Sequence, residues 1–490
     1  MVRLSFRLVA TLLLGLGATE WAMAQGQGGA EAPGSVQHVE LETATTATTG
    51  ASVPFWLHAN TDGRVDPTSS AGGLRGQVRG TLGAGKRWSI GYGLEATARA
   101  SDNEAAYLSE AYVEAQYGFL QLWGGRRPQV IGAAEGPLTS GSLSMSRNAT
   151  PLPTVALATR GYTGVPLTNR WLEFKGRYTH AWMEDNRVAE GAYLHQKTFY
   201  LRVGQPAPVR VYAGLVHNAM WGGTTSRFGR LPQSLGDYGR TVVALNGSED
   251  APVGEAAYIQ GNHLGTIDMG LSADVGAFRF DAYRQFIYED RDNLKLQSPQ
   301  DGLLGLVLAD TRDGRWLDRI VYEHLYTKWQ NGPVPPDGPE RGGPGGQDNY
   351  YNHYIYRSGW TFYGRTVGNP LLTPSTNGGT GIANNRVVGH HLGVAGHLGP
   401  VAYRFLATYT RNYGTYSGEE AAQEAGRDYR FAPPLQQTSF LAEASTPWPT
   451  DDRFALLAAI GVDAGEMYAD AVGLRLGVRY NPLRRTESGL

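Results

Sequence analysis

Hydrophobic and polar residues alternate with a period of two along many segments of this chain. From 472 to 480 the even positions are apolar and the odd positions are glycine or arginine. Residues 88–97, 172–178 and 401–408 alternate in the same way. Successive side chains of a β-strand point to opposite faces, so this period favours strands and leaves little room for helix. The pattern predicts an all-β protein.

Alternation alone does not say whether the apolar face meets a protein core or lipid. Aromatic residues recur near the ends of the predicted strands, as at Trp88, Trp123, Trp171 and Tyr480, where membrane barrels carry interfacial girdles. The opposite faces combine charged residues with many glycines, which suits a wide lumen. A lysine or arginine at mid-depth on a lipid face would cost about 2–4 kcal/mol. We therefore predict an antiparallel transmembrane β-barrel.

We predict about eighteen strands, and bacterial barrels have an even number. If the amino terminus is periplasmic, short turns should alternate with long outer loops. Short links occur at 83–85 and 399–400, and long ones at 218–261 and 329–384. The stretch 148–168 is long where a short turn is due, and is interpreted as a periplasmic insertion or a plug. The predicted strands are 54–60, 72–83, 86–100, 104–117, 118–125, 141–147, 169–182, 192–204, 208–217, 262–275, 276–290, 302–309, 316–328, 385–398, 399–413, 434–446, 452–464 and 468–480.

One barrel accounts for most of the length. Residues 1–24 have the features of a signal peptide: Arg3 and Arg7, an apolar run, and Ala-Met-Ala before Gln25. We predict a periplasmic amino-terminal segment over 25–52, the outer-membrane barrel with long extracellular loops over 53–480, and a tail over 481–490. No later run approaches the ~18 apolar residues of a spanning helix.

Composition narrows the class further. The 490 residues include 66 Gly and 27 Tyr, and only 18% are charged, as a lipid-facing exterior requires. Cysteine is absent, which excludes disulfides and cysteine-ligated zinc. The formal charge of −2 gives no basic excess that would favour nucleic acid.

Motifs for catalysis or cofactor binding are not found. The 11 histidines include no HExxH or comparable spacing for a metal. The sequence Gly-Ser-Leu-Ser at 141–144 does not match a GxSxG nucleophile elbow. We therefore predict no cofactor, no metal and no enzymatic activity. Because envelope hydrolases can build a triad on strands, a hydrolase stays an alternative.

Aromatic and amide side chains are dense in the predicted outer loops. Sugar rings stack on aromatic faces, and their hydroxyls bond to Asn, Arg and His. One interpretation is a saccharide-binding outer face; the other is that these residues fold the loops into the lumen as a plug. The candidate binding residues are Trp221, Tyr350, Tyr351, Asn352, Trp360, Arg365, Asn369, Asn384, Asn385 and Arg386.

Charged residues on the polar strand faces are expected to lie in the lumen. We predict that they pair there and hold the barrel closed. They are Glu95, Glu173, Lys175, Arg177, Asp281, Arg404, Arg475 and Arg479.

Several stretches, in order along the chain, resemble the capsule assembly Wzi family of outer-membrane proteins. They are 53–60, 141–148 with Pro151 and Pro153, 194–197 with Tyr200, 214–217 with 221–223, and 349–370 followed by 384–386. The resemblance implies an 18-stranded barrel closed by loops and a lectin-like role in holding exported capsular polysaccharide at the cell surface. Some family members carry a periplasmic helical bundle, for which 25–52 is too short.

The predicted function is therefore an outer-membrane, lectin-like barrel that binds capsular polysaccharide and helps assemble or attach the capsule. Its expected partners are that polysaccharide, outer-membrane lipid and the barrel-assembly machinery, with no nucleic acid and a monomeric state. A porin or transport channel for small solutes or saccharides is the first alternative. An outer-membrane hydrolase is the second.

Overall fold

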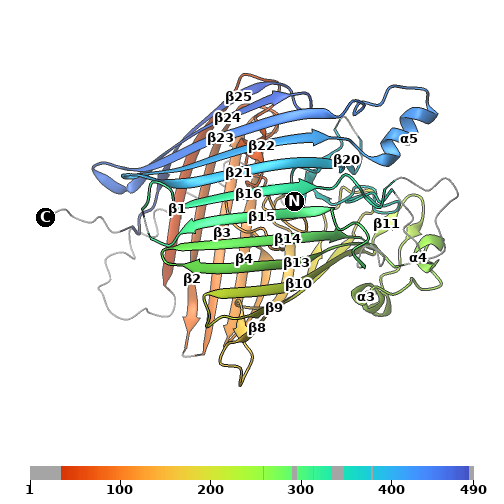
Figure 1. Cartoon of the computed structure of the whole chain (residues 1–490), viewed down its shortest axis with the longest axis horizontal. Helices are drawn as coiled ribbons and strands as arrows, with labels where there is room; N and C mark the ends of the chain where they lie inside the picture. The colour runs from red at the N-terminus through yellow and green to blue at the C-terminus, as the bar shows by residue number, and fades with distance from the viewer. Residues whose placement is uncertain are drawn as a thin grey trace.

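The chain forms a closed antiparallel barrel of 18 strands (Figure 1). The computed structural model describes residues 35–484 except 86, 258, 290–294, 313, 333–346 and 377–378, so the predicted signal peptide lies outside the described residues. The first strand pairs with the last, from Leu41 with Tyr480 to Thr48 with Gly473, which closes the cylinder. No described helix is long and apolar enough to span a membrane.

Each barrel strand pairs with its neighbours in sequence, and β7 (Thr163–Gly164) adds a short pairing to β8. The barrel strands are β1 (Val36–Thr48), β2 (Ala71–Ala84), β3 (Trp88–Ala100), β4 (Ala105–Tyr117), β5 (Leu120–Arg126), β6 (Pro153–Thr159), β8 (Leu172–Trp182), β9 (Tyr193–Val203), β10 (Val209–Trp221), β13 (Asn262–Val275), β14 (Phe278–Tyr288), β15 (Gly302–Asp310), β16 (Arg319–Tyr326), β21 (Val387–Leu398), β22 (Val401–Asn412), β23 (Leu435–Trp448), β24 (Asp451–Gly465) and β25 (Ala471–Tyr480).

The loops carry the remaining short elements. Helices α3, α4 and α5 lie at the end of the barrel where the long loops gather (Figure 1). The elements are α2 (Phe55–His58), β11 (Thr224–Thr225), β12 (Gly229–Arg230), α3 (Leu235–Val242), α4 (Val253–Ala257), β17 (Thr361–Phe362), β18 (Arg365–Thr366), β19 (Thr373–Pro374), β20 (Ile382–Asn384) and α5 (Tyr416–Glu424).

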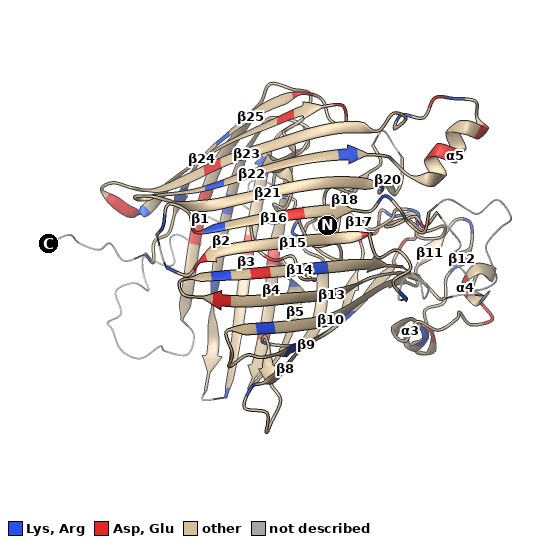
Figure 2. Ribbon diagram, viewed as in Figure 1, with Lys and Arg blue, Asp and Glu red and all other residues tan. Residues whose placement is uncertain are grey.

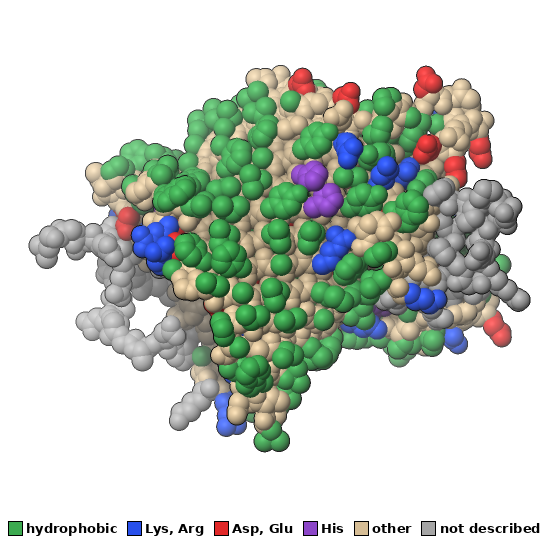
Figure 3. All heavy atoms as spheres, viewed as in Figure 1, with side chains coloured by type: hydrophobic (Ala, Val, Ile, Leu, Met, Phe, Trp, Pro, Cys, Tyr) green, Lys and Arg blue, Asp and Glu red, His purple; other side chains and the backbone are tan. Residues whose placement is uncertain are grey.

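The predicted alternation decides which side chains meet lipid. Along β25, Val472, Leu474 and Leu476 are exposed on the outside, whereas Arg475 and Arg479 point inward to Glu42. Hydrophobic side chains are spread over the strand wall on the face drawn in Figure 3, with histidine and a few Lys or Arg side chains among them. The exposed apolar residues therefore form the lipid-facing band that the sequence predicts.

Short turns and long loops separate to opposite ends of the barrel. The β13–β14 and β21–β22 turns need left-handed backbone, which Gly276 (φ 60°) and Gly399 (φ 59°) supply without a steric penalty. Short turns are periplasmic in outer-membrane barrels and long loops extracellular. Since β1 begins and β25 ends at the short-turn end, the described part of the chain starts and finishes on the periplasmic side.

Two predicted strands are wrong, and two real strands were missed. Residues 54–60 contain helix α2, and 141–147 forms no strand, although its residues alternate. Residues on both faces of that second segment are buried, Ser142 and Leu143 alike, because it lies inside the lumen. The missed strands are β1, within the predicted periplasmic segment 25–52, and β6, within 148–168.

These corrections remove the apparent break in the loop pattern. Residues 127–152 form one long outer loop, and 160–171 is the turn at the opposite end that joins β6 to β8. The missed strand β6 had a readable pattern, because Val155 and Leu157 are exposed while Thr154 and Ala156 are buried. Its short alternation was hidden beside the prolines at 151 and 153.

Loop segments fill the barrel lumen. The β1–β2 loop (49–70), the β5–β6 loop (127–152) and part of the β16–β21 loop contribute Trp56, Leu143, Met145, Tyr351 and Trp360 to one buried apolar cluster. The Trp360 Nε1 donates a hydrogen bond to the Ser144 carbonyl at 2.9 Å. The Trp56 Nε1 donates to Thr408 Oγ1 on the barrel wall at 3.0 Å. The predicted plug is therefore confirmed.

Candidate functional site

A polar groove with a volume of about 830 Å³ lies among the long loops at the outer end. It is walled by the β10–β13, β16–β21 and β22–β23 loops. Its lining is rich in hydroxyl, amide, aromatic and arginine side chains. The lining residues are Arg227, Asn349, Asn352, His353, Tyr354, Arg357, Ser375, Thr380, Ile382, Ala383, Thr415, Ser417, Gly418, Tyr429 and Phe431.

Local hydrogen bonds hold the groove walls in place. The Asn352 amide joins two stretches of the β16–β21 loop, since its Oδ1 accepts from the Ile382 N–H at 2.8 Å and its Nδ2 donates to the Ile382 carbonyl at 2.9 Å. On the opposite wall, Thr415 caps helix α5, and its Oγ1 accepts from the Gly418 N–H at 2.9 Å. The Tyr429 hydroxyl accepts from the Thr415 N–H at 2.7 Å. These hydrogen bonds fix the loops that form the groove.

Arginine makes the groove electropositive. Arg227 and Arg357 are exposed, and neither forms an ion pair with any carboxylate in the described part of the chain. None of the described lining residues is Asp or Glu. Burial lowers the pKa of His353 to about 3, so this imidazole is neutral and the charge comes from the two guanidinium groups.

The aromatic surface of the groove is provided mainly by Tyr354. This side chain is 46% exposed, and its ring lies against His353, with 4.6 Å between the ring centroids. Tyr429 and Phe431, both on the β22–β23 loop, also line the groove and lie in contact, with ring centroids 5.6 Å apart. Exposed aromatic faces beside amides and hydroxyls are the surface that a sugar ring can bind.

The structure places most of the predicted binding residues in the interior. Those that are buried are Trp221, Tyr350, Tyr351, Trp360, Asn369, Asn384, Asn385 and Arg386. Asn352 borders the groove. Arg365 does not line the groove: it is half-buried and donates hydrogen bonds to the carbonyls of His58 and Val65 in the β1–β2 loop.

The buried aromatic candidates fasten the plug. The Tyr350 hydroxyl donates to Asp301 Oδ2 at 2.9 Å, and the Tyr351 hydroxyl donates to the Leu143 carbonyl. Trp221 lies on the outer wall, with its ring centroid 5.0 Å from that of Tyr238 in α3. The Tyr350 and Tyr351 hydroxyls therefore bind the protein itself, whereas the buried Trp221 Nε1 has no hydrogen-bond partner among the described residues.

The buried amides and Arg386 have the same structural role. The Asn385 Nδ2 donates to the Tyr350 carbonyl at 2.8 Å, and the Asn384 Nδ2 donates to Asn412 Oδ1 at 2.9 Å. The Asn369 Nδ2 donates to Ser140 Oγ at 3.1 Å. Arg386 pairs with Glu419 of α5 at 3.1 Å. The sequence favoured these residues as glycan ligands because amides bind sugar hydroxyls. Amides bind the backbone of buried loops equally well, and composition does not distinguish the two roles.

Sequence reasoning missed most of the groove. Arg227, Arg357, Ser417 and Tyr429 come from three loops that are far apart in the chain. Their position in long outer loops was the only available signal, and it does not distinguish an exposed side chain from a buried one. Convergence of the loops is what defines the site.

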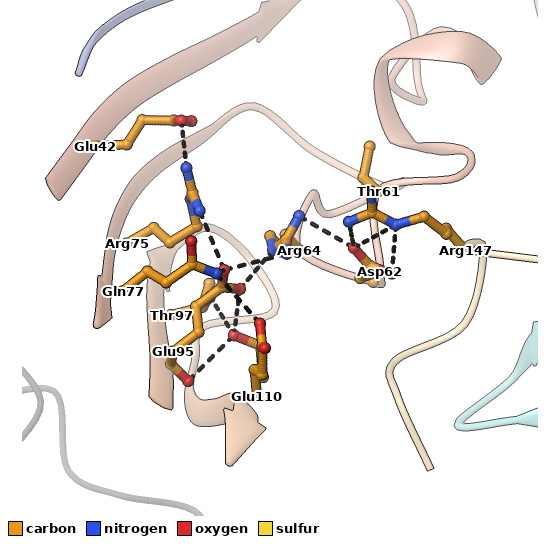
Figure 4. Close-up of polar contacts among 12 residues, drawn as sticks. Glu42, Thr61, Asp62, Arg64, Arg75, Gln77, Glu95, Thr97, Glu110 and Arg147 are labelled. Carbon is orange, nitrogen blue, oxygen red and sulfur yellow. Dashed lines mark hydrogen bonds and ion pairs between the residues drawn. The ribbon is translucent and has the colours of Figure 1, made fainter. Parts of the chain in front are cut away.

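A second cavity, of about 450 Å³, lies in the lumen below the plug. Most of its arginines are paired with carboxylates, as Figure 4 shows for Arg64, Arg75 and Arg147, whereas Arg99 donates to the carbonyls of Gly63 and Asn103. The Arg64 Nε lies 2.7 Å from Glu95 Oε1, and the Arg75 Nη1 lies 3.1 Å from Glu95 Oε2. Asp62 pairs with Arg64 at 3.2 Å and also with Arg147. Since Asp62 and Arg147 belong to different plug segments, this network ties the plug together and to the wall.

The predicted lumen pairing is confirmed for most of the charged residues. Positive and negative residues are interspersed along the strands (Figure 2). Arg177 and Asp281 depart from the prediction, because they bond to the neutral groups of Gln129 and Ser272. The confirmed pairs are Glu95 with Arg64 and Arg75, Glu173 with Arg170 and Arg202, Lys175 with Glu135, Arg404 with Glu443, and Arg475 and Arg479 with Glu42.

The histidines do not converge as metal ligands in the part of the chain that the structure describes. His195, His217 and His263 lie on neighbouring strands, and His217 Nε2 is 2.9 Å from His263 Nδ1. Among the described residues, no group of three His, Asp or Glu side chains, these histidines included, is arranged to hold a metal ion.

Comparison with known families and structures identifies the family. The model of the capsule assembly protein Wzi family matches residues 46–378. The chain belongs to the Wzi family. The family match and the closed barrel together place this Wzi-family chain in the outer membrane.

One of the solved structures that match this chain shows the same fold. The Escherichia coli protein described as Wzi, an outer membrane protein involved in group 1 capsule assembly and a carbohydrate-binding β-barrel, matches with a TM-score of 0.56 and 14% identity, over 90% of this chain and 83% of that one. The OccK5 (OpdH) structure from Pseudomonas aeruginosa matches with a TM-score of 0.46 and 9% identity, over 91% of this chain and 97% of that one. No curated protein matches this chain in sequence.

Proposed function

We propose that this Wzi-family barrel binds acidic capsular polysaccharide in the outer groove and so helps to assemble or attach the capsule. The observation that carries the proposal is the groove itself, whose described lining exposes Tyr354, Arg227 and Arg357 and contains no acidic residue. A carboxylate-bearing sugar would receive charge-assisted hydrogen bonds from the guanidinium groups. The solved family member is described as a carbohydrate-binding barrel, which supports the same class of ligand.

The proposal is binding without catalysis. The polar groups of the groove are amides, hydroxyls and arginines that hold a sugar chain by hydrogen bonds. We propose that the protein acts as a monomer, with the polysaccharide as its partner outside and the barrel-assembly machinery as its partner during biogenesis. The first and last described residues lie on the periplasmic side, which leaves the outer end of the barrel to the loops that form the groove.

Direct binding to the purified barrel tests the groove. We expect a Tyr354→Ala variant to lose about threefold to tenfold in affinity for an acidic capsular polysaccharide, because a stacking face is removed. Tyr409→Ala is the matched control, since Tyr409 is 37% exposed but lies on β22 in the barrel wall. Equal affinity of the Tyr354 variant and the wild type would contradict the groove as the binding site.

Deletion of the gene tests the cellular role. We expect polysaccharide to be released into the medium while its synthesis continues, because the chain retains the polymer and does not make it. Re-expression of the Tyr354→Ala variant should restore attachment only in part. Unchanged cell-attached polysaccharide after deletion would overturn the proposal.

A further inference from the structure

Helix α3 is packed on the outside of the barrel. On β9, Leu194 belongs to the buried lumen cluster, so His195 and Lys197 face outward by alternation. The Tyr238 ring of α3 lies 5.6 Å from His195 and 5.0 Å from Trp221 of β10, measured between ring centroids. The Tyr238 and Tyr178 hydroxyls are 2.8 Å apart, so α3 covers the outer ends of β8, β9 and β10.

The polar side of α3 faces the protein. Asp237 and Thr241 are buried, and Gln260 Nε2 donates to the Asp237 carbonyl at 3.1 Å. Ser234 and Asp237 form a capping box that fixes the first turn. The Lys197 ammonium donates to the Val242 carbonyl at the end of the helix. The helix is thus held on the wall by polar contacts.

The apolar side of the same segment faces outward. Leu235 is 90% exposed, Val243 58% and Leu245 46%. Leu235 begins α3, and Val243 and Leu245 follow its last residue; the exposed positions between them are Gly236, Gly239 and Arg240. Apolar side chains are thus exposed at both ends of the segment, whereas a helix on a soluble protein buries its apolar stripe. Exposed apolar residues grouped in this way mark a contact with lipid or protein.

The outward side of α3 continues the lipid-facing band. Below the helix, Phe199 (52% exposed) and Leu215 (42%) point outward from β9 and β10. Beside it, Tyr178 and Trp182 are about as exposed, at 42% and 41%, and aromatic residues of this kind mark the membrane interface. We infer that residues 235–245 form a flap seated in the outer leaflet of the membrane, with Leu235, Val243 and Leu245 in contact with lipid.

Single-cysteine labelling tests this inference, because the chain contains no cysteine. A Leu235→Cys variant carrying an environment-sensitive dye is placed in nanodiscs of phosphatidylcholine and phosphatidylglycerol with a nitroxide near the top of the acyl chain. We expect the nitroxide lipid to lower its emission about twofold, because an interfacial segment buries its apolar side chains at the boundary of headgroups and acyl chains. Leu201→Cys on β9, 41% exposed in the lipid-facing band, is the positive control.

Ala421→Cys is the matched control in another loop helix. It is exposed on α5, and we expect its emission to be unchanged by the nitroxide lipid. Emission of the Leu235 variant that stays equally unchanged would show a flap facing water and overturn the inference. Quenching that requires more than one barrel per disc would show a contact with a second copy of the chain, and would also overturn it.

Discussion

The outer groove and the lumen cavity both contain arginine, but the two regions use it differently. In the lumen, Arg64 and Arg75 contact Glu95, whose side chain is fully buried. In the groove, Arg227 and Arg357 have no ion-pair partner in the described part of the chain. An arginine that is paired with a carboxylate stabilises the fold, whereas an exposed arginine without such a partner can bind an anion. The two regions differ because the lumen places Glu95 beside its arginines, whereas the described groove lining contains no Asp or Glu.

The largest effect is expected from breaking the lumen network at Glu95. Glu95→Ala leaves the Arg64 and Arg75 guanidinium groups without a shared partner, and breaking a buried pair costs about 3–5 kcal/mol. We expect the folded barrel to melt at a clearly lower temperature. The change in gel mobility on heating measures this melting. Glu420→Ala, at an exposed site on α5, is the control. Equal melting of both variants would show that the network does not hold the barrel.

A smaller effect is expected where the network joins the plug segments. Asp62→Ala removes the pairing with Arg64 and Arg147 while leaving the wall contacts of Glu95 in place. We expect the wild type to show no steady ion current in a planar bilayer and the variant to show intermittent current, because the 49–70 and 127–152 loops can separate. Steady current through the wild type would contradict a closed plug and support the porin alternative.

The groove arginines should affect binding and leave folding unchanged. We expect Arg357→Ala to weaken binding of an acidic polysaccharide about tenfold, since a hydrogen bond to a charged group contributes about 1.5–3 kcal/mol. Raising the salt concentration should narrow this difference, because exposed charges are screened. The measurement is affinity for immobilised polysaccharide.

A lumen arginine is the matched control for that loss. Arg79 is 44% exposed, comparable to many surface arginines, but pairs with Glu110 at 2.9 Å. Arg79→Ala should leave polysaccharide affinity unchanged and lower stability. If both variants lost affinity equally, the distinction between paired and unpaired arginine would fail.

The barrel could be predicted from sequence because period-two alternation repeats in nearly every strand. The errors arose where another rule governed the pattern. Residues 141–147 alternate, yet both faces are buried in the plug. Strand β6 is short, begins at Pro153 and closely follows Pro151. Most of the groove was missed for a different reason. Arg227, Arg357 and Tyr429 meet only through loop folding, which local pattern does not encode.

A pH-dependent effect is expected at Glu255, a buried carboxyl near the groove with no arginine partner among the described residues. Burial raises its pKa to about 7, and its Oε1 has no hydrogen-bond partner among the described residues. The packed loop keeps the proton up to about pH 7, whereas the opened loop loses it near the ordinary value of 4.5. The contribution to loop stability is therefore fully present below the ordinary pKa and is lost as the pH rises through about 7.

Hydrogen exchange of the β10–β13 loop measures this effect. We expect residues 245–257 to be protected less at about pH 8 than at about pH 5, by an amount on the order of 1–3 kcal/mol. Glu255→Gln keeps the shape and remains uncharged, so its protection should not depend on pH once the intrinsic exchange rate is corrected for. A variant that kept the wild-type pH dependence would assign the effect to another group. That outcome would also remove the contrast with Glu95. Glu95 pairs with Arg64 and Arg75, whereas Glu255 pairs with no arginine among the described residues.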